Sequence, residues 1–262
     1  MADKLRLGGM ALSNGVLVHG PSAWACAIRT NEGELKVASA HKRYRASDLE
    51  GKPLLRGIAK IAEVFALLPQ VRRALPQARL PMEKPGVLVA MVASAVTVRV
   101  LRGSKLTPAA QELLGGLLAF GPAALSLRSG EIAGYHGAEH VSIGTYEHGE
   151  VREREHERCG THLVGPMLAT SALGGLLATR APARFQGPAR LVAQLGAVAA
   201  STEVFSWMVR NPENPLARAL ARPGHELQHR LATAEPTHDQ LEVAEAALAE
   251  CLRLEDEHRN QI

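Results

Sequence analysis

Four apolar stretches, arranged in two pairs, constrain the fold of this 262-residue chain more than any other feature. They cover residues 87–98, 113–127, 163–178 and 191–209. A helix that crosses a bilayer needs about 20 predominantly apolar residues. The first three stretches are shorter than that, and the fourth contains the polar residues Gln194 and Glu203. Small residues recur in all four, which permits close helix packing in lipid or in a protein core.

Short basic loops connect the two stretches of each pair. Their basic residues are Arg99, Arg102, Lys105, Arg180, Arg184 and Arg190. If each pair is a transmembrane hairpin, these loops should mark the cytoplasmic side. The N-terminal region and residues 210–222 are also basic, so the charge distribution gives no clean orientation. Two interpretations are open: two membrane hairpins, or a buried helical bundle in a soluble protein.

The first 50 residues predict a small β region. The segments 23–29 and 35–40 flank the sequence Asn31-Glu-Gly-Glu34. A glycine-containing turn between two such segments is typical of a β-hairpin. From Pro53 onwards apolar residues recur at helical spacing, which predicts an amphipathic helix that ends at Pro69.

The C-terminal end predicts a further helix. Thr237 and Gln240 match a capping box, and an apolar stripe follows them. The predicted fold class is therefore α+β and mostly helical. It has a β region at 1–50 and a helical region at 51–262, with four apolar helices in two hairpins and a C-terminal amphipathic helix. A metal-type loop at 128–162 separates the two hairpins.

The composition does not favour a nucleic-acid-binding protein. Aromatic residues make up 3% of the chain, whereas modules that stack bases usually need more. The net charge of +4 comes from scattered arginines, which fits attraction to an anionic membrane surface equally well. The three cysteines, Cys26, Cys159 and Cys251, are too few and too widely spaced for a disulfide framework. No apolar run at the N-terminus resembles a signal peptide, so we expect a reducing compartment for the polar parts.

The segment His136-Gly-Ala-Glu-His140 carries the strongest chemical signal. On a helix, His136, Glu139 and His140 point to one side, with Cβ atoms about 5–6 Å apart. The order H-x-x-E-H is the inverted form of a zinc-protease motif, in which two imidazoles hold zinc and the carboxylate activates a water. A pattern as short as H-x-x-E-H also arises by chance, and on its own it is equally typical of solvated polar residues that bind no metal.

A second group of candidate ligands begins 16 residues after His140, in His156-Glu-Arg-Cys159-Gly-Thr-His162. An imidazole and a thiolate three positions apart suit a soft or borderline metal. We therefore predict a metal site made of His136, His140, His156 and Cys159, with zinc favoured and iron or copper as alternatives. In the competing interpretation, Cys159 is a small buried residue and the histidines hydrogen-bond the loop.

Four further residues flank these motifs, namely Tyr135, Tyr146, Glu147 and His162. They are candidates for orienting the ligands or positioning a substrate. They could equally be ordinary loop residues.

At these residues the chain resembles the YqhQ-like family, a group of bacterial membrane proteins of unknown function. The matching site residues are Tyr135-His-Gly-Ala-Glu-His140, Tyr146-Glu147 and His156-Glu-Arg-Cys-Gly-Thr161. Other segments similar to the family's motifs are Gly8-Gly9 to Gly15-Val16, Gly20-Pro21, Pro53-Leu-Leu-Arg-Gly57, Pro223-Gly224, Leu227-Gln228, Glu235-Pro236 and Gln240-Leu-Glu-Val-Ala244. These motifs follow the family's order over almost the whole chain.

The chain departs from the family pattern at Met10, Asn14 and His162, and its apolar segments are shorter and more polar than is typical of the family. The resemblance implies a membrane protein with its polar motifs on one side, and it implies no reaction. An even number of crossing segments would put both termini and residues 128–162 on the same side. By the argument from the cysteines, that side is the cytoplasmic face of a bacterial cytoplasmic membrane, the alternative being a soluble cytoplasmic protein.

Two hypotheses for the function follow. The first is a metal-dependent hydrolase at the membrane face, with Glu139 as general base. The second is a non-catalytic membrane or assembly protein whose metal fixes the loop at 135–162. Coordination separates them, because catalytic zinc keeps one open position and structural zinc is closed by four protein ligands. Membrane lipid is the expected partner, and the sequence does not predict the oligomeric state.

Overall fold

Four short strands form an antiparallel sheet in the order in which they occur in the sequence. The structure is a computed structural model that describes residues 4–44, 46–49, 51–127 and 130–261. The strands are β1 (Gly8–Leu12), β2 (Gly15–His19), β3 (Ala23–Arg29) and β4 (Leu35–His41). The hairpin predicted around Asn31-Glu-Gly-Glu34 joins β3 to β4, with Gly33 at a φ of 83°. A positive φ is readily adopted by glycine, which has no Cβ.

Both faces of the sheet are covered by helices, as the alternation of side chains along β3 requires. Ala25 and Ala27 face α4 (Gly130–His148) and α8 (His238–Arg259), whereas Trp24, Cys26 and Ile28 face α1 (Leu55–Ala74). Alanines on the first face leave room for two helices to pack side by side. The sheet therefore has a separate apolar core on each side, one shared with α4 and α8 and the other with α1.

Helix α1 continues five residues beyond Pro69, so the prediction that it ends there is wrong. Proline in a helix removes one backbone hydrogen bond. Here the ring lies on the exposed side of the helix. The next turn carries Val71, which is fully buried against the sheet, and Leu75 follows it into the same core. Burial of these apolar side chains offsets the lost hydrogen bond.

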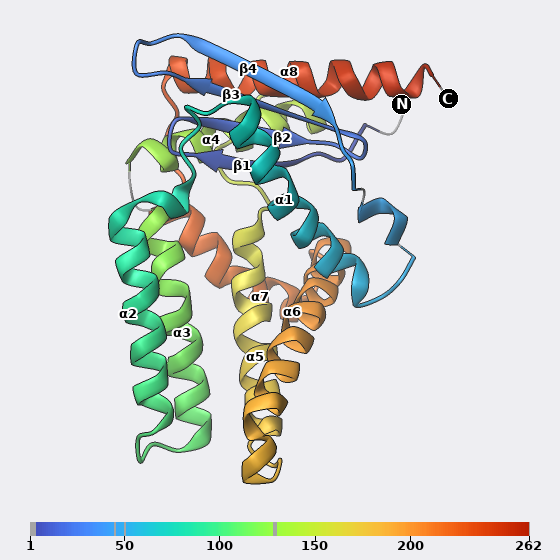
Figure 1. Ribbon diagram of the computed structural model, residues 1–262. Coiled ribbons are helices and arrows are strands. Elements are labelled where there is room, and N and C mark those ends of the chain that lie inside the picture. Colours follow the sequence, from blue (N-terminus) through green and yellow to red (C-terminus); the bar gives the residue numbers. More distant parts are fainter. Residues whose placement is uncertain (1–3, 45, 50, 128–129, 262) are drawn as a thin grey trace.

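The four apolar stretches form two helical hairpins that extend side by side from the same end of the sheet layer (Figure 1). The helices are α2 (Pro85–Arg102), α3 (Pro108–Leu127), α5 (Val164–Ala178) and α6 (Gln186–Arg210). Together with the short helices that precede α5 and α6, each is long and apolar enough to cross a membrane. The predicted fold class, mostly helical with a small N-terminal sheet, is confirmed.

The apolar side chains of these helices face outwards. Only 6% of the span at 85–102 and 11% of the span at 108–127 is buried, and the other two spans are 33% and 28% buried. Val89, Val92 and Leu191 are each more than 60% exposed. Apolar patches this large are rare on monomeric soluble proteins. The hairpins are therefore not a buried bundle, and they indicate a membrane-associated protein.

The tips of the two hairpins are joined by a buried charged group. Glu112 of α3 is 6% exposed and lies 3.7 Å from Arg102 of α2 and 3.8 Å from Arg190 of α6. Its side chain occupies space that a Cβ at Gly175 of α5 would fill. All four apolar helices thus meet at Glu112.

The opposite ends of the hairpins are tied to the sheet layer. The side chain of Arg56 at the start of α1 donates to Glu203 of α6, with 2.9 Å between Nε and Oε1. Gly57 lies against Thr202, where a Cβ would come within 1.8 Å of the hydroxyl oxygen. The motif that ends in Arg56-Gly57 therefore docks α1 on α6.

Two further elements connect α6 to the sheet layer. Helix α7 (Pro215–Leu227) packs on α5 and α6, and a single turn of π-helix, η5 (Gln228–Ala232), follows it. The capping box predicted for Thr237 and Gln240 is present at the start of α8. The remaining short helices are η1 (Ala46–Leu49), η2 (Pro81–Glu83), η3 (Gly160–Leu163) and η4 (Ala183–Phe185).

Candidate metal centre

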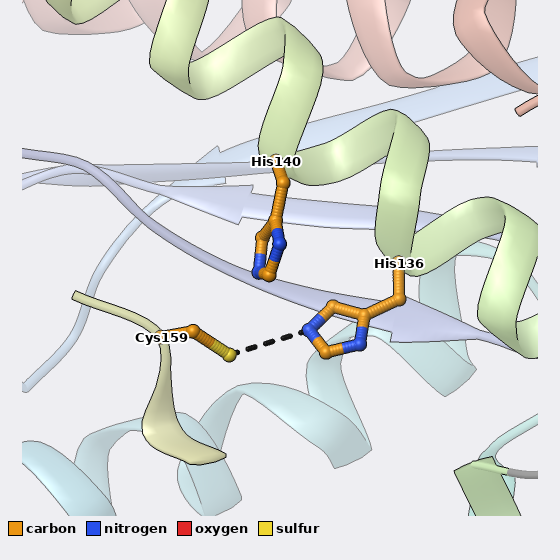
Figure 2. A group of neighbouring side chains, drawn as sticks. All are labelled: His136, His140 and Cys159. Atoms are coloured by element: carbon orange, nitrogen blue, oxygen red, sulfur yellow. Dashed lines mark hydrogen bonds between the residues drawn. The ribbon is translucent and has the colours of Figure 1, made fainter. Parts of the chain in front are cut away.

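Helix α4 carries two candidate ligands on one side. His136 and His140 are one turn apart, and their ring centroids are 4.3 Å from each other. Both side chains are buried, with 7% and 3% exposed. Figure 2 shows both rings pointing towards the segment that carries Cys159. Most of the segment that the sequence analysis treats as a loop is thus helical, and the helix aligns the two imidazoles.

Each imidazole is held by a hydrogen bond to a backbone carbonyl. Nδ1 of His136 lies 2.8 Å from the carbonyl oxygen of Ala232, and Nδ1 of His140 lies 2.7 Å from that of Arg154. A carbonyl accepts only, so each Nδ1 carries the proton and each Nε2 presents a lone pair. Burial lowers the pKa of His140, which keeps its ring neutral. Metal-binding histidines show the same arrangement, because the second nitrogen is fixed by a carbonyl or a carboxylate.

Cys159 completes a group of three donors. Its Sγ lies 3.4 Å from Nε2 of His136, and ligand atoms of Cys159, His136 and His140 all lie within 4.8 Å of one another. The thiol is half-buried, at the residue that precedes η3. Among the residues that the structure describes, this is the one group of histidine, cysteine or acidic side chains with metal-binding spacing. Two nitrogens and one sulfur suit zinc.

Segment η5 positions both halves of this group. Gln228 is fully buried, and its amide contacts the backbone of His156 through both its oxygen and its nitrogen, at 2.9 and 3.2 Å. The same amide nitrogen donates to the Thr161 hydroxyl at 2.7 Å. At the other end of the segment, the Ala232 carbonyl holds His136. One turn of π-helix therefore fixes the cysteine loop and one imidazole together, and such turns are frequent at functional sites.

Gly137 allows this segment to approach α4. A Cβ at Gly137 would lie 2.1 Å from the carbonyl oxygen of Ala234. The backbone N–H of Ala234 in turn donates to the Ala133 carbonyl at 2.9 Å. The glycine inside the His136-Gly-Ala-Glu-His140 motif is thus required for close backbone packing. Gly160 is not required in this way, because a Cβ there would meet nothing within 4 Å.

Glu139 lies beside the group rather than within it. Its side chain reaches strand β1, where a Cβ at Gly9 would come within 2.4 Å of Oε1. Its Oε2 is buried without a hydrogen-bond partner. Burial raises the pKa of Glu139. A buried oxygen without a hydrogen-bond partner is consistent with a site that binds an ion, a water molecule or a ligand next to it.

His156 is adjacent to the group, but other residues occupy both its ring nitrogens. Nε2 lies 3.2 Å from the Glu147 carboxylate, and Nδ1 accepts from the backbone N–H of Arg158 at 3.2 Å. Its ring centroid is 5.6 Å from that of His140. Burial raises the pKa of Glu147, but His156 and Arg158 outweigh this effect and hold it below its usual value. The structure thus places Glu147 in a supporting position for His156.

Of the other three flanking residues, Tyr135, Tyr146 and His162, only His162 contacts a residue that holds the site together. Tyr135 packs in the core between the sheet and α8, and burial raises its pKa. Tyr146 lies at the surface beneath Lys4, whose Nζ is 5.6 Å from the ring centroid. His162 is buried and contacts the Gln228 amide at 3.1 Å, so it adjoins the cysteine loop.

The site lies within the part of the chain that matches a family model. Residues 130–254 match the family described as "Protein of unknown function (DUF1385)". This segment runs from the start of α4 into α8 and contains all three clustered side chains. The match supports an uncharacterised family, and the YqhQ-like assignment stays a prediction. No curated protein and no solved structure matches the chain.

Proposed function

We propose that the protein is a membrane-associated, zinc-dependent hydrolase, with His136, His140 and Cys159 as metal ligands. The observation that carries this proposal is the convergence of three donors, two of which have Nδ1 tied to backbone carbonyls. Three protein ligands leave one position of tetrahedral zinc open, as in catalytic sites. His156 is the nearest further imidazole, and its engagement by Glu147 and Arg158 argues against a closed site with four ligands.

In this proposal Glu139 is the general base. Zinc in such a site supplies an activated water as the nucleophile. Glu139 lies next to His140 on α4, and its unpartnered Oε2 is the atom that would take the proton. The other carboxylate oxygen, Oε1, lies against Gly9 of β1. Residues of the 156–162 segment would form the other wall of the site, since Gln228 fixes this segment opposite α4.

X-ray absorption at the zinc edge tests the ligand set without a substrate. We expect about one zinc per chain, with two nitrogen ligands and one sulfur ligand at about 2.0–2.1 and 2.3 Å, and a further light-atom ligand. Cys159→Ser should remove the sulfur shell, and His140→Ala should remove the metal. His148→Ala is the matched control, because His148 is on the same helix and outside the group.

Two results would contradict the proposal. Zinc content no higher than in His140→Ala would exclude the metal site. A zinc shell closed by four protein ligands would exclude the open position and with it the hydrolase.

We also infer that the metal centre faces the cytoplasm of a bacterial cell. The free thiol of Cys159 requires a reducing compartment to stay available as a ligand. Strand β1 and helix α8, the first and last elements of the described chain, lie at the sheet end of the molecule, away from the hairpin tips (Figure 1). Green fluorescent protein fused after residue 262 should therefore fluoresce, and a periplasmic phosphatase inserted at 103–107 should be active. The opposite pattern would reverse the orientation.

A further inference from the structure

Helix α7 lies where the hairpins meet the sheet layer (Figure 1). It begins at Pro215, soon after the candidate membrane span that ends at Arg210. Its inner side is fixed against η3, since a Cβ at Gly224 would lie 2.5 Å from Cα of His162. A helix held this close to the end of a membrane span sits at the boundary between lipid and water.

The outer side of this helix and of η5 carries a row of basic and imidazole side chains. The residues are Arg218, Arg222, His225 and His229, all exposed, and we call them the α7 stripe. Their spacing of four, three and four positions places them along one side of the helix. The side chains of Arg218, His225 and His229 are 63%, 57% and 59% exposed.

The segment that carries the α7 stripe has a small excess of positive charge. Residues 210–230 contain four arginines and two glutamates, and Glu155 adds a third carboxylate beside the stripe. Arg218 pairs with Glu213 at 2.9 Å, but both side chains are largely exposed, and such pairs are weak. His225 and His229 each direct Nδ1 to the Glu155 carboxylate, at 3.2 and 2.7 Å.

We propose that the α7 stripe binds the headgroups of anionic phospholipids at the membrane surface. Basic residues on an amphipathic helix next to a membrane span are attracted to anionic lipid. The chemistry is complementary, because guanidinium groups pair well with phosphate. Leu216, two residues before Arg218, is 59% exposed, and Trp207 lies near the end of α6. Tryptophan is enriched at this depth of a membrane.

This binding would connect the lipid surface to the candidate metal centre. The carboxylate of Glu155 contacts the imidazoles of both His225 and His229. In the sequence, Glu155 lies between Arg154 and His156. The Arg154 carbonyl holds His140. A headgroup at the stripe would therefore lie next to the loop that shapes the site. The proposal concerns lipid binding alone, so it does not depend on zinc being present.

Tryptophan quenching by brominated lipids tests it. The chain has two tryptophans, and Trp24 is 2% exposed in the core of the sheet layer, so it gives a constant background. The full protein is reconstituted in phosphatidylcholine that contains equal fractions of either brominated phosphatidylglycerol or brominated phosphatidylcholine. We expect stronger quenching of Trp207 by the anionic lipid. Attraction of one arginine to an anionic surface corresponds to about a fivefold local enrichment.

Arg218→Gln with Arg222→Gln should bring quenching by the two lipids to the same level. The matched control is Arg253→Gln with Arg259→Gln on α8, which removes the same charge from exposed arginines outside the α7 stripe. This control should keep the difference. Equal quenching by both lipids in the unmodified protein would overturn the proposal. So would a difference that survives in the Arg218 and Arg222 variant.

Discussion

The glycine at position 137 offers a direct test of how the metal centre is held together. In Gly137→Ala the new Cβ would stand 2.1 Å from the carbonyl oxygen of Ala234. Ordinary contact begins at 3.4 Å, so the two backbones must separate by about 1.3 Å. The opposing atom is backbone, which cannot swing aside as a flexible side chain can. The segment that carries the Ala232 carbonyl must therefore move away from α4.

That movement acts on His136. Its Nδ1 lies 2.8 Å from the Ala232 carbonyl oxygen, and an increase of similar size would take the pair well beyond hydrogen-bonding range. His136 would lose the contact that fixes its tautomer and ring orientation. Loss of such a supporting contact typically lowers metal affinity about 10–100-fold. Crowding at a packed position should also lower the free energy of unfolding by about 1–3 kcal/mol.

Zinc affinity can be measured by competition with a chelator, and stability by thermal unfolding in detergent with and without zinc. Gly160→Ala is the matched control, because Gly160 adjoins Cys159 and an added Cβ there meets nothing within 4 Å. The control should bind zinc as the unmodified protein does. Equal zinc affinity in Gly137→Ala and Gly160→Ala would refute the role assigned to the Ala232 carbonyl.

Three further changes have defined outcomes. Glu139→Gln should retain zinc but lower hydrolysis about 10²–10⁴-fold, and loss of zinc in this variant would end its assignment as a base. Burial lowers the pKa of His19 to about 3, from a usual value of 6.5. Below pH 6.5 the unfolded chain therefore binds a proton at His19 that the folded chain does not bind. The free energy of unfolding then falls as the pH drops from 6.5 towards 3. Thermal melts of His19→Gln should show a weaker pH dependence over that range. Glu112→Gln leaves Arg102 and Arg190 without their counter-charge, and it should lower the free energy of unfolding by up to about 3–5 kcal/mol; an unchanged melting temperature would show that the hairpin tips do not depend on this group.

The parts of the fold that depend on neighbouring residues could be predicted from the sequence. The β3–β4 hairpin follows from a glycine-containing turn, and the start of α8 follows from the pairing of Thr237 with Gln240. In each case the deciding contacts join residues a few positions apart. The end of α1 could not be predicted in this way. Whether Pro69 ends the helix depends on how deeply Val71 is buried against the sheet, which is a tertiary contact.

The same distinction applies to the candidate metal centre. His136 and His140 are visible as a pair because they are four positions apart on one helix. The carbonyl that holds His136 comes from Ala232, 96 positions away, and every residue has a carbonyl, so no side-chain pattern could identify it. Gln228 is different: the pair Leu227-Gln228 is part of the family-like pattern, but a glutamine alone does not indicate that it ties down a loop. The separation of His156 from the group of three could not be predicted either, because it results from contacts with Glu147 and Arg158.

The three clustered donors belong to two different layers of the molecule. His136 and His140 are on α4, which packs against the sheet. Cys159 immediately precedes Gly160, where the third candidate membrane span begins. The distance between the thiol and the imidazoles therefore depends on how the membrane hairpins sit relative to the sheet. Gln228 spans this junction, since η5 links α7 on the membrane side to the Ala232 carbonyl beside α4. A metal bound by all three donors would join the sheet layer to the apolar hairpins, and the reaction proposed at this site would then take place where the hairpins meet the sheet layer.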